Sequence, residues 1–119
     1  MKVNFVSIGA TCAALGIVLG AFGAHALRGQ LTETELGLWE TATRYWLVGS
    51  LGMSLFGLSA RGREQSLVPG WLLFAGSSLF AVSLYALSLG APRALGAVTP
   101  FGGLGLILGF LSFAWSARR

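Results

Sequence analysis

Four stretches of about twenty mostly apolar residues, joined by short polar links, constrain how this chain can fold. A helix of about twenty residues spans the roughly 30 Å hydrocarbon core of a bilayer, because each residue rises about 1.5 Å. None of the stretches alternates apolar and polar residues as a barrel strand would. We therefore expect an all-α integral membrane protein: a single four-transmembrane-helix bundle over residues 1–119. The expected spans cover residues 3–27, 41–60, 67–89 and 97–117.

The charge content argues against a soluble domain and against nucleic-acid binding. Charged residues make up 10% of the chain, against roughly 25% in soluble domains, and the mean hydropathy is +0.75. The net charge of +4 comes from scattered arginines, whereas nucleic-acid binding needs Lys and Arg clustered on one face. The expected partners are therefore membrane lipid and either a second copy or another membrane protein, with no nucleic acid.

The chemically reactive residue types are too few for a catalytic or metal site. Cys12 and His25 are the only cysteine and the only histidine, fewer than a closed metal site needs. The chain contains no Asp, so a Ser-His-Asp arrangement is excluded. We expect no catalytic residues, no metal and no cofactor, and the protein is not expected to be an enzyme.

The polar links predict helix ends and orientation. Thr32-x-x-Glu35 reads as a capping box, which starts a helix near Glu33 that continues into the second span, and Pro92 is expected to stop the third helix. The positive-inside rule favours cytoplasmic termini in a bacterial inner (cytoplasmic) membrane, since five basic residues would share one side. These are Lys2, Arg61, Arg63, Arg118 and Arg119, against Arg28, Arg93 and Arg44 on the other side.

Aromatic residues gather near the expected span ends. They are Trp39, Tyr45, Trp46, Trp71 and Trp115. Trp and Tyr are enriched where a membrane meets water, so these residues are expected to form an aromatic belt at the two interfaces.

Small residues recur with a period of 3.5 in the first and fourth spans. The first stripe contains Gly9, Gly16, Gly20 and Gly23, and the other contains Gly102, Gly105 and Gly109. Small residues let helix backbones approach closely in lipid. We expect the first and fourth helices to contact each other along these stripes, although such stripes could also line a pore.

The chain resembles the bacterial family called domain of unknown function 423, which is related to the eukaryotic transmembrane protein 256-like proteins. Several short stretches carry the resemblance in order and spacing. They are Gly20-Ala21-Phe22-Gly23-Ala24-His25, Thr41-Ala42 with Tyr45, Ser83-Leu84-Tyr85 with Leu87 and Gly90, and Thr99-Pro100-Phe101-Gly102-Gly103 with Gly109-Phe110. The resemblance implies a small membrane protein without a settled reaction or substrate. Gly49 stands where the family often carries a second histidine, so the resemblance does not imply a two-histidine site here.

Polar residues are expected to converge at the outer helix ends. The candidate cluster is His25, Arg44, Tyr45, Tyr85 and Thr99. His25 could sense pH or simply cap a helix end, and Arg44 could be functional, snorkel to the interface or pair with Glu40 one turn before it. The cluster as a whole is either a binding site or a hydrogen-bonded plug, and both interpretations require His25 and Tyr85 to lie close together.

Two classes of function remain open. The first is an accessory, scaffolding or interaction protein that acts through helix contacts. The alternative is an oligomeric small channel or transporter for a small solute or ion, although the spans contain no embedded carboxylate of the kind that proton-coupled transport uses.

Overall fold

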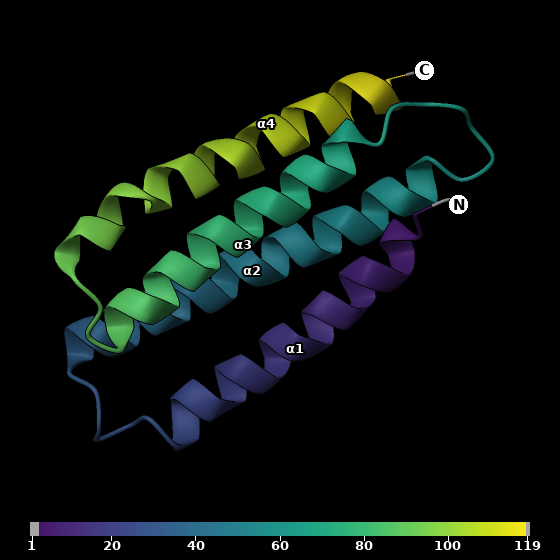
Figure 1. Ribbon diagram of the computed structural model, residues 1–119. Coiled ribbons are helices and arrows are strands. Elements are labelled where there is room, and N and C mark those ends of the chain that lie inside the picture. Colours follow the sequence, from purple (N-terminus) through teal and green to yellow (C-terminus); the bar gives the residue numbers. More distant parts are fainter. Residues whose placement is uncertain (1–2, 119) are drawn as a thin grey trace.

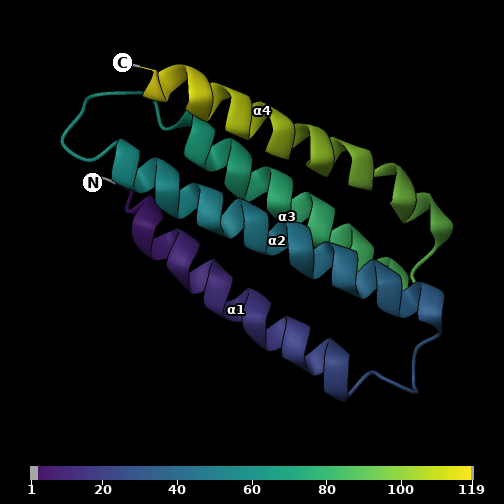
Figure 2. The ribbon, with the colours of Figure 1, turned by 180° about the vertical axis from the view of Figure 1, so that it is seen from behind.

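The computed structural model describes residues 3–118 as four α-helices that alternate in direction (Figure 1). They are α1 (Phe5–His25), α2 (Glu33–Ser59), α3 (Val68–Ser88) and α4 (Thr99–Ala117), with a short 3-10 helix, η1 (Arg93–Ala97), before α4. Helices α1 and α4 form the two edges, with α2 and α3 between them (Figures 1 and 2). Both ends of the described chain lie beside the α2–α3 link. The expected all-α class is confirmed.

The helix ends follow from local hydrogen bonds. The Thr32 N–H donates to Glu35 Oε1 at 2.9 Å, and the Glu35 N–H donates to Thr32 Oγ1 at 3.1 Å, so the predicted capping box is confirmed. Helix α3 ends at Ser88, before Pro92, because Gly90 takes a left-handed φ of +99° that ends the helix in a turn. Helix α4 starts two residues later than expected, because η1 occupies the chain before it.

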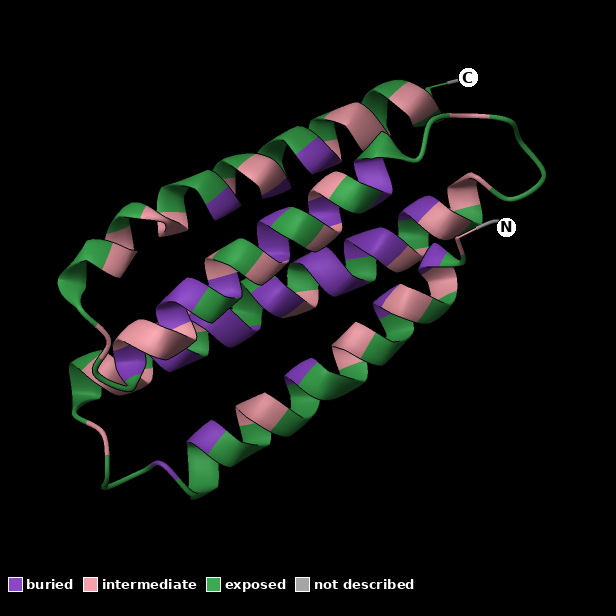
Figure 3. Cartoon of the chain, in the orientation of Figure 1, coloured by how far each residue is buried: buried purple, intermediate pink, exposed green. Residues whose placement is uncertain are grey.

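Three of the helical segments are long and apolar enough to cross a membrane. They are Phe5–His25, Val68–Ser88 and Arg93–Ala117. Helix α2 does not meet the same criterion, and its position explains its composition. It lies between α1 and α3 and carries many of the buried residues (Figure 3). Its polar Thr43 and Ser50 are therefore buried, and their hydroxyls donate to the Trp39 and Trp46 carbonyls one turn earlier on α2, which replace water.

The expected contact between the first and fourth helices is wrong. Helix α1 packs on α2, α2 on α3, and α3 on α4, which places α1 and α4 at opposite edges (Figure 1). Each small-residue stripe faces the helix adjacent in sequence instead. A period of 3.5 shows that a helix keeps one face toward a partner, but it does not identify the partner.

Helix α1 is attached to α2 by hydrogen bonds from α2 side chains to α1 backbone carbonyls. The Trp39 indole N–H donates to the Leu19 carbonyl at 2.8 Å, and the Trp46 indole N–H donates to the Cys12 carbonyl at 2.7 Å. Further along, the Ser54 hydroxyl donates to the Val6 carbonyl at 3.0 Å. These bonds span the length of α1 and join it to α2 at three levels.

A glycine follows each accepting carbonyl by three or four residues. A helical side chain covers the turn before its own Cα, so a glycine leaves the carbonyl one turn earlier open to a donor. A Cβ on Gly16 would lie 2.7 Å from Trp46 Cδ1, and a Cβ on Gly23 would collide with the Trp39 indole. A Cβ on Gly9 would lie 2.7 Å from Ser54 N. These glycines make room for the donors of α2.

Helices α3 and α4 meet through their backbones. A Cβ on Gly102 would lie 2.7 Å from Phe80 Cα, and one on Gly105 would lie 3.0 Å from Gly76 Cα. A Cβ on Gly109 would lie 3.0 Å from Leu73 N. Backbone atoms cannot move aside as a flexible side chain can, so this contact depends on the absence of side chains at these positions.

Gly16→Ala is expected to destabilise the protein, because the added methyl group displaces the Trp46 indole that bonds to α1. Overpacking of this kind costs about 1–3 kcal/mol. Gly37→Ala is the control: Gly37 is also helical, but a Cβ there meets nothing within 4 Å, so it should be neutral or gain up to about 1 kcal/mol. Thermal unfolding in detergent, followed by circular dichroism, measures both. Equal melting temperatures would contradict the α1–α2 contact.

Gly102→Ala should likewise lower the free energy of unfolding by about 1–3 kcal/mol, since it pushes the backbones of α3 and α4 apart. Its neighbour Gly103 provides a matched control, because a Cβ there would lie 3.7 Å from the Phe80 ring, an ordinary contact. The same unfolding assay applies. If Gly103→Ala were as harmful as Gly102→Ala, the backbone contact would not be the cause.

Candidate functional site

The polar cluster that was expected at the outer helix ends centres on α2 and α3. Tyr85 and Thr43 share a hydrogen bond of 2.5 Å between their hydroxyls, and the Thr43 hydroxyl also lies 3.1 Å from the Trp39 carbonyl. The Trp39 and Tyr85 rings meet edge to face, with 4.4 Å between their centroids. Thr43 and Trp39 lie one turn apart on α2, which presents both to the same region of α3.

A second pair links α3 to α4. The hydroxyls of Ser83 and Thr99 lie 2.6 Å apart, and Ser83 is 3% exposed. The Ser83 hydroxyl also donates to the Phe80 carbonyl at 2.9 Å. Thr99 opens α4, so this pair fixes the start of α4 against the side of α3.

The other candidates lie at the surface. His25 is exposed, because two residues along a helix turn it about 200° away from Gly23, which faces α2. Trp39 packs against both Gly23 and Tyr85, and His25 lies two residues after Gly23, so His25 and Tyr85 are at the same end of the molecule. No hydrogen bond joins them in the described chain.

Arg44 and Tyr45 also face outward from α2. Arg44 is exposed, and no ion pair to Glu40 or to any other carboxylate is present within residues 3–118. Tyr45 is 41% exposed, and its ring rests against Phe80 at a centroid distance of 5.0 Å. Only Tyr85 and Thr99 of the five candidates therefore take part in interhelical hydrogen bonds.

Sequence reasoning missed Trp39, Thr43 and Trp46 as members of the interior network. Both tryptophans were expected in an interfacial belt, but Trp39 is 6% exposed and Trp46 is 9% exposed. Their spacing could have indicated this role, because residues 39, 43 and 46 are separated by four and three positions and therefore share one helix face. Trp71 and Trp115, in contrast, are 47% and 68% exposed, as an aromatic belt requires.

The chemistry available to this network is limited to hydrogen bonding. Its members are neutral hydroxyl, indole and backbone groups that already pair with one another. No group of three His, Cys, Asp or Glu residues that could hold a metal ion occurs within residues 3–118. The arrangement holds neighbouring helices together and fits the plug interpretation better than the binding-site interpretation.

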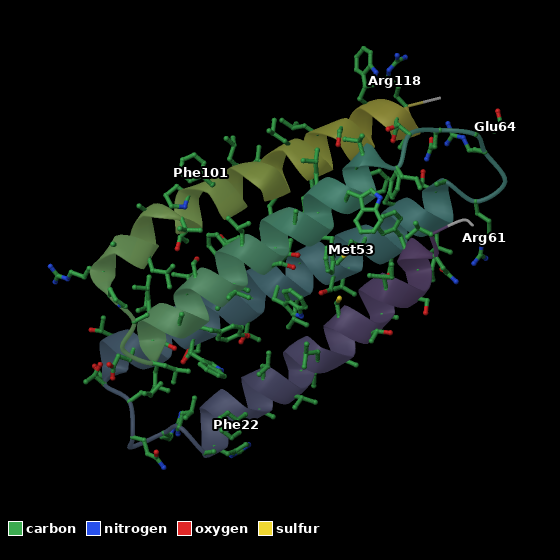
Figure 4. All side chains as sticks on the ribbon, in the orientation of Figure 1. Phe22, Met53, Arg61, Glu64, Phe101 and Arg118 are labelled. Atoms are coloured by element: carbon green, nitrogen blue, oxygen red, sulfur yellow. The ribbon has the colours of Figure 1, made fainter. Side chains whose placement is uncertain are left out.

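Among the hollows outside this network are two of similar volume. One is an apolar groove of about 690 Å³ between α2 and α4, over Phe80 of α3. The other, of about 660 Å³, is at the opposite end of the molecule, where the α2–α3 link passes the start of α1. Arg61 and Glu64 mark this link in Figure 4.

Comparison with known proteins supports the resemblance seen in the sequence. The family model described as "Protein of unknown function (DUF423)" matches residues 19–103, from the last part of α1 to the first turn of α4. No solved structure matches the chain.

Relatives of similar length are named membrane proteins. The UPF0382 membrane protein YwdK of Bacillus subtilis is 39% identical over 122 residues, which covers 100% of this chain and 98% of the relative. A UPF0382 membrane protein of Staphylococcus epidermidis is 42% identical over 112 residues, 93% of this chain and 91% of its own. One from Staphylococcus haemolyticus is 41% identical over 108 residues, 90% of this chain and 88% of its own. With its four α-helices and this degree of identity, the chain belongs to the DUF423 family of membrane proteins of unknown function.

Proposed function

We propose that this protein crosses the cytoplasmic membrane four times and acts as an accessory or scaffolding protein through contacts of its helices within the membrane. The observation that carries the proposal is the pairing of the interior polar groups. The Thr43–Tyr85 and Ser83–Thr99 hydroxyl pairs, together with the Trp39 and Trp46 indoles, already have partners within the protein. A conduit needs polar groups left to receive a solute or ion.

The position of α2 supports a fourth span. Its 27 residues make a helix about 40 Å long, enough to cross a bilayer. It runs beside α1 and α3, two segments apolar enough to cross, and bonds to α1 at three levels. A helix shielded from lipid on two sides needs fewer apolar residues than its neighbours do.

The charge distribution supports cytoplasmic termini. Arg61 and Arg118 share the end of the molecule where the described chain starts and finishes (Figure 4), and Arg63 bonds to the Ser116 carbonyl at the same end. Lys2 and Arg119, which were also assigned to this side, lie outside the described residues. The positive-inside rule then assigns this end to the cytoplasm.

The outer faces of the two edge helices are the surfaces left for a partner. Large apolar side chains on α1 and α4 point outward, including Phe22 and Phe101, which are 50% and 69% exposed (Figure 4). In a membrane, such a face contacts lipid or a neighbouring helix. A scaffolding role would use these faces while the internal hydrogen bonds keep the protein rigid.

Reporter insertions in the two links that flank α2 test the topology. If α2 crosses the membrane, a reporter at Gly29 should signal from outside and a reporter at Gly62 from the cytoplasm. Both positions are turns in which a side chain would meet nothing within 4 Å, so insertion should be tolerated. The same location for both reporters would reduce the protein to three spans, and an external carboxyl terminus would reverse the orientation.

Tyr85→Phe, compared with Tyr45→Phe, tests the plug. The first substitution removes the hydroxyl bonded to Thr43 and should cost about 0.6–1.7 kcal/mol of stability, whereas Tyr45 has no hydrogen bond within the described chain and its substitution should be neutral. Reconstituted wild-type protein should give no more ion or solute flux from liposomes than empty liposomes do. A protein-dependent flux that Tyr85→Phe alters without loss of stability would favour a channel or transporter instead.

A further inference from the structure

The hollow at the cytoplasmic end lies among three parts of the chain. The start of α1, the end of α2 and the link that follows α2 enclose about 660 Å³. Its accessible apolar lining includes Val6 and Leu67, and its polar lining includes Asn4, Arg61 and Gln65. A site with both an apolar and a polar lining suits an amphiphilic molecule.

The polar lining is rich in hydrogen-bond donors. Asn4 accepts the Ser7 N–H through its Oδ1 at 3.1 Å, which leaves the side-chain NH₂ as a donor. Gln65 Nε2 is buried and has no hydrogen-bond partner in the described chain. The terminal torsion of a glutamine is broad, so a rotation of the amide can turn this donor into the hollow.

The two arginines of the link have different roles. Arg63 donates to the Ser59 carbonyl at 3.4 Å and to the Ser116 carbonyl at 3.3 Å, and so joins the ends of α2 and α4. The Arg61 guanidinium is exposed and makes no hydrogen bond to the described residues. Figure 4 shows Arg61 beside the start of α1, with Glu64 further along the link and pointing outward. Arg61 is therefore the cation available to a ligand.

The start of α1 adds to the positive potential. The amino end of a helix carries a partial positive charge, and Val6 in the first turn of α1 lines the hollow. Gly57 lets the end of α2 pack closely against this turn, because a Cβ there would lie 2.7 Å from the Val6 nitrogen. An anionic group seated here would meet Arg61, two amide donors and the helix end together.

We propose that this hollow binds the phosphate headgroup of an anionic phospholipid of the cytoplasmic leaflet, with Arg61 contacting the phosphate and the lipid's apolar part resting on Val6 and Leu67. Basic pockets between membrane-spanning helices on the cytoplasmic side are known binding places for such headgroups. Glu64 also lines the hollow, so Arg61 and Arg63 together leave one net positive charge. The proposal rests on the orientation proposed above, which puts this end in the cytoplasm, and not on the scaffolding role.

Lipid titration of the purified full-length protein in a non-ionic detergent tests the site. Phosphatidylglycerol is added, and bound lipid is counted by native mass spectrometry while the melting temperature is followed. Phosphatidylcholine and inorganic phosphate form the comparison arms. The variants are Arg61→Gln, Gln65→Glu, which is nearly isosteric but adds a negative charge, and Arg93→Gln, which removes an exposed arginine at the opposite end. Arg63 is left intact because it joins two helices.

Phosphatidylglycerol should bind and raise the melting temperature, and phosphatidylcholine should do so much less. Arg61→Gln should weaken binding about fivefold, because one arginine near an anionic membrane surface raises the binding affinity by about that factor. Gln65→Glu should weaken binding at least as much, and Arg93→Gln should leave it unchanged.

Three results would overturn the proposal. The first is equal binding of both lipids, and the second is equal loss in Arg61→Gln and Arg93→Gln. The third is displacement of the lipid by millimolar inorganic phosphate, which would assign the hollow to a soluble anion. Circular dichroism of each variant checks that a loss of binding is not a loss of fold.

Discussion

The hydrogen bonds from α2 side chains to the α1 backbone are the interaction on which the rest of the structure depends. Where helices pack closely there is no water to satisfy an indole or hydroxyl donor, and Trp39, Trp46 and Ser54 find acceptors on a neighbouring helix. Helix carbonyls can accept only where no side chain covers them. The glycines of α1 supply those openings. Helix α2 also carries Thr43, whose hydroxyl bonds to Tyr85 of α3. Helix α2 is thus the central element, and its polar side chains perform the attachment.

Much of the fold could be predicted because it depends on local chemistry. The capping box at Thr32 and Glu35 specified the start of α2, and apolar stretches located the helices to within a few residues at most ends. The pairing of helices could not be predicted in this way. Both glycine stripes have the same period, so periodicity matched α1 to α4, whereas their actual partners are the Trp and Ser side chains of α2 and the backbone of α3. When two helices fit together through different residue types, their sequences do not show a common repeat that would identify them as partners.

The candidate cluster was predicted in part for a related reason. Tyr85 and Thr99 do form interhelical bonds, but His25 and Arg44 face outward, although all four lie near the same helix ends. Depth along a helix can be counted from the sequence, whereas the direction of a side chain depends on where the neighbouring helix packs. The hollow beside Arg61 shows the same limit, since Asn4 and Gln65 are far apart in sequence and line the same hollow only because α1 and α2 are antiparallel.

The neighbour-to-neighbour order of the helices has a consequence for biogenesis. Because each helix packs on the one made just before it, α2 meets α1, α3 meets α2 and α4 meets α3 in the order of synthesis. No helix has to wait in the bilayer for a distant partner, and no later helix has to be threaded between two earlier ones. The donors of α2 can find their carbonyls on α1 as soon as the first hairpin has left the ribosome. The protein can therefore assemble by successive addition at one growing edge, with α1 left as the free edge from the beginning.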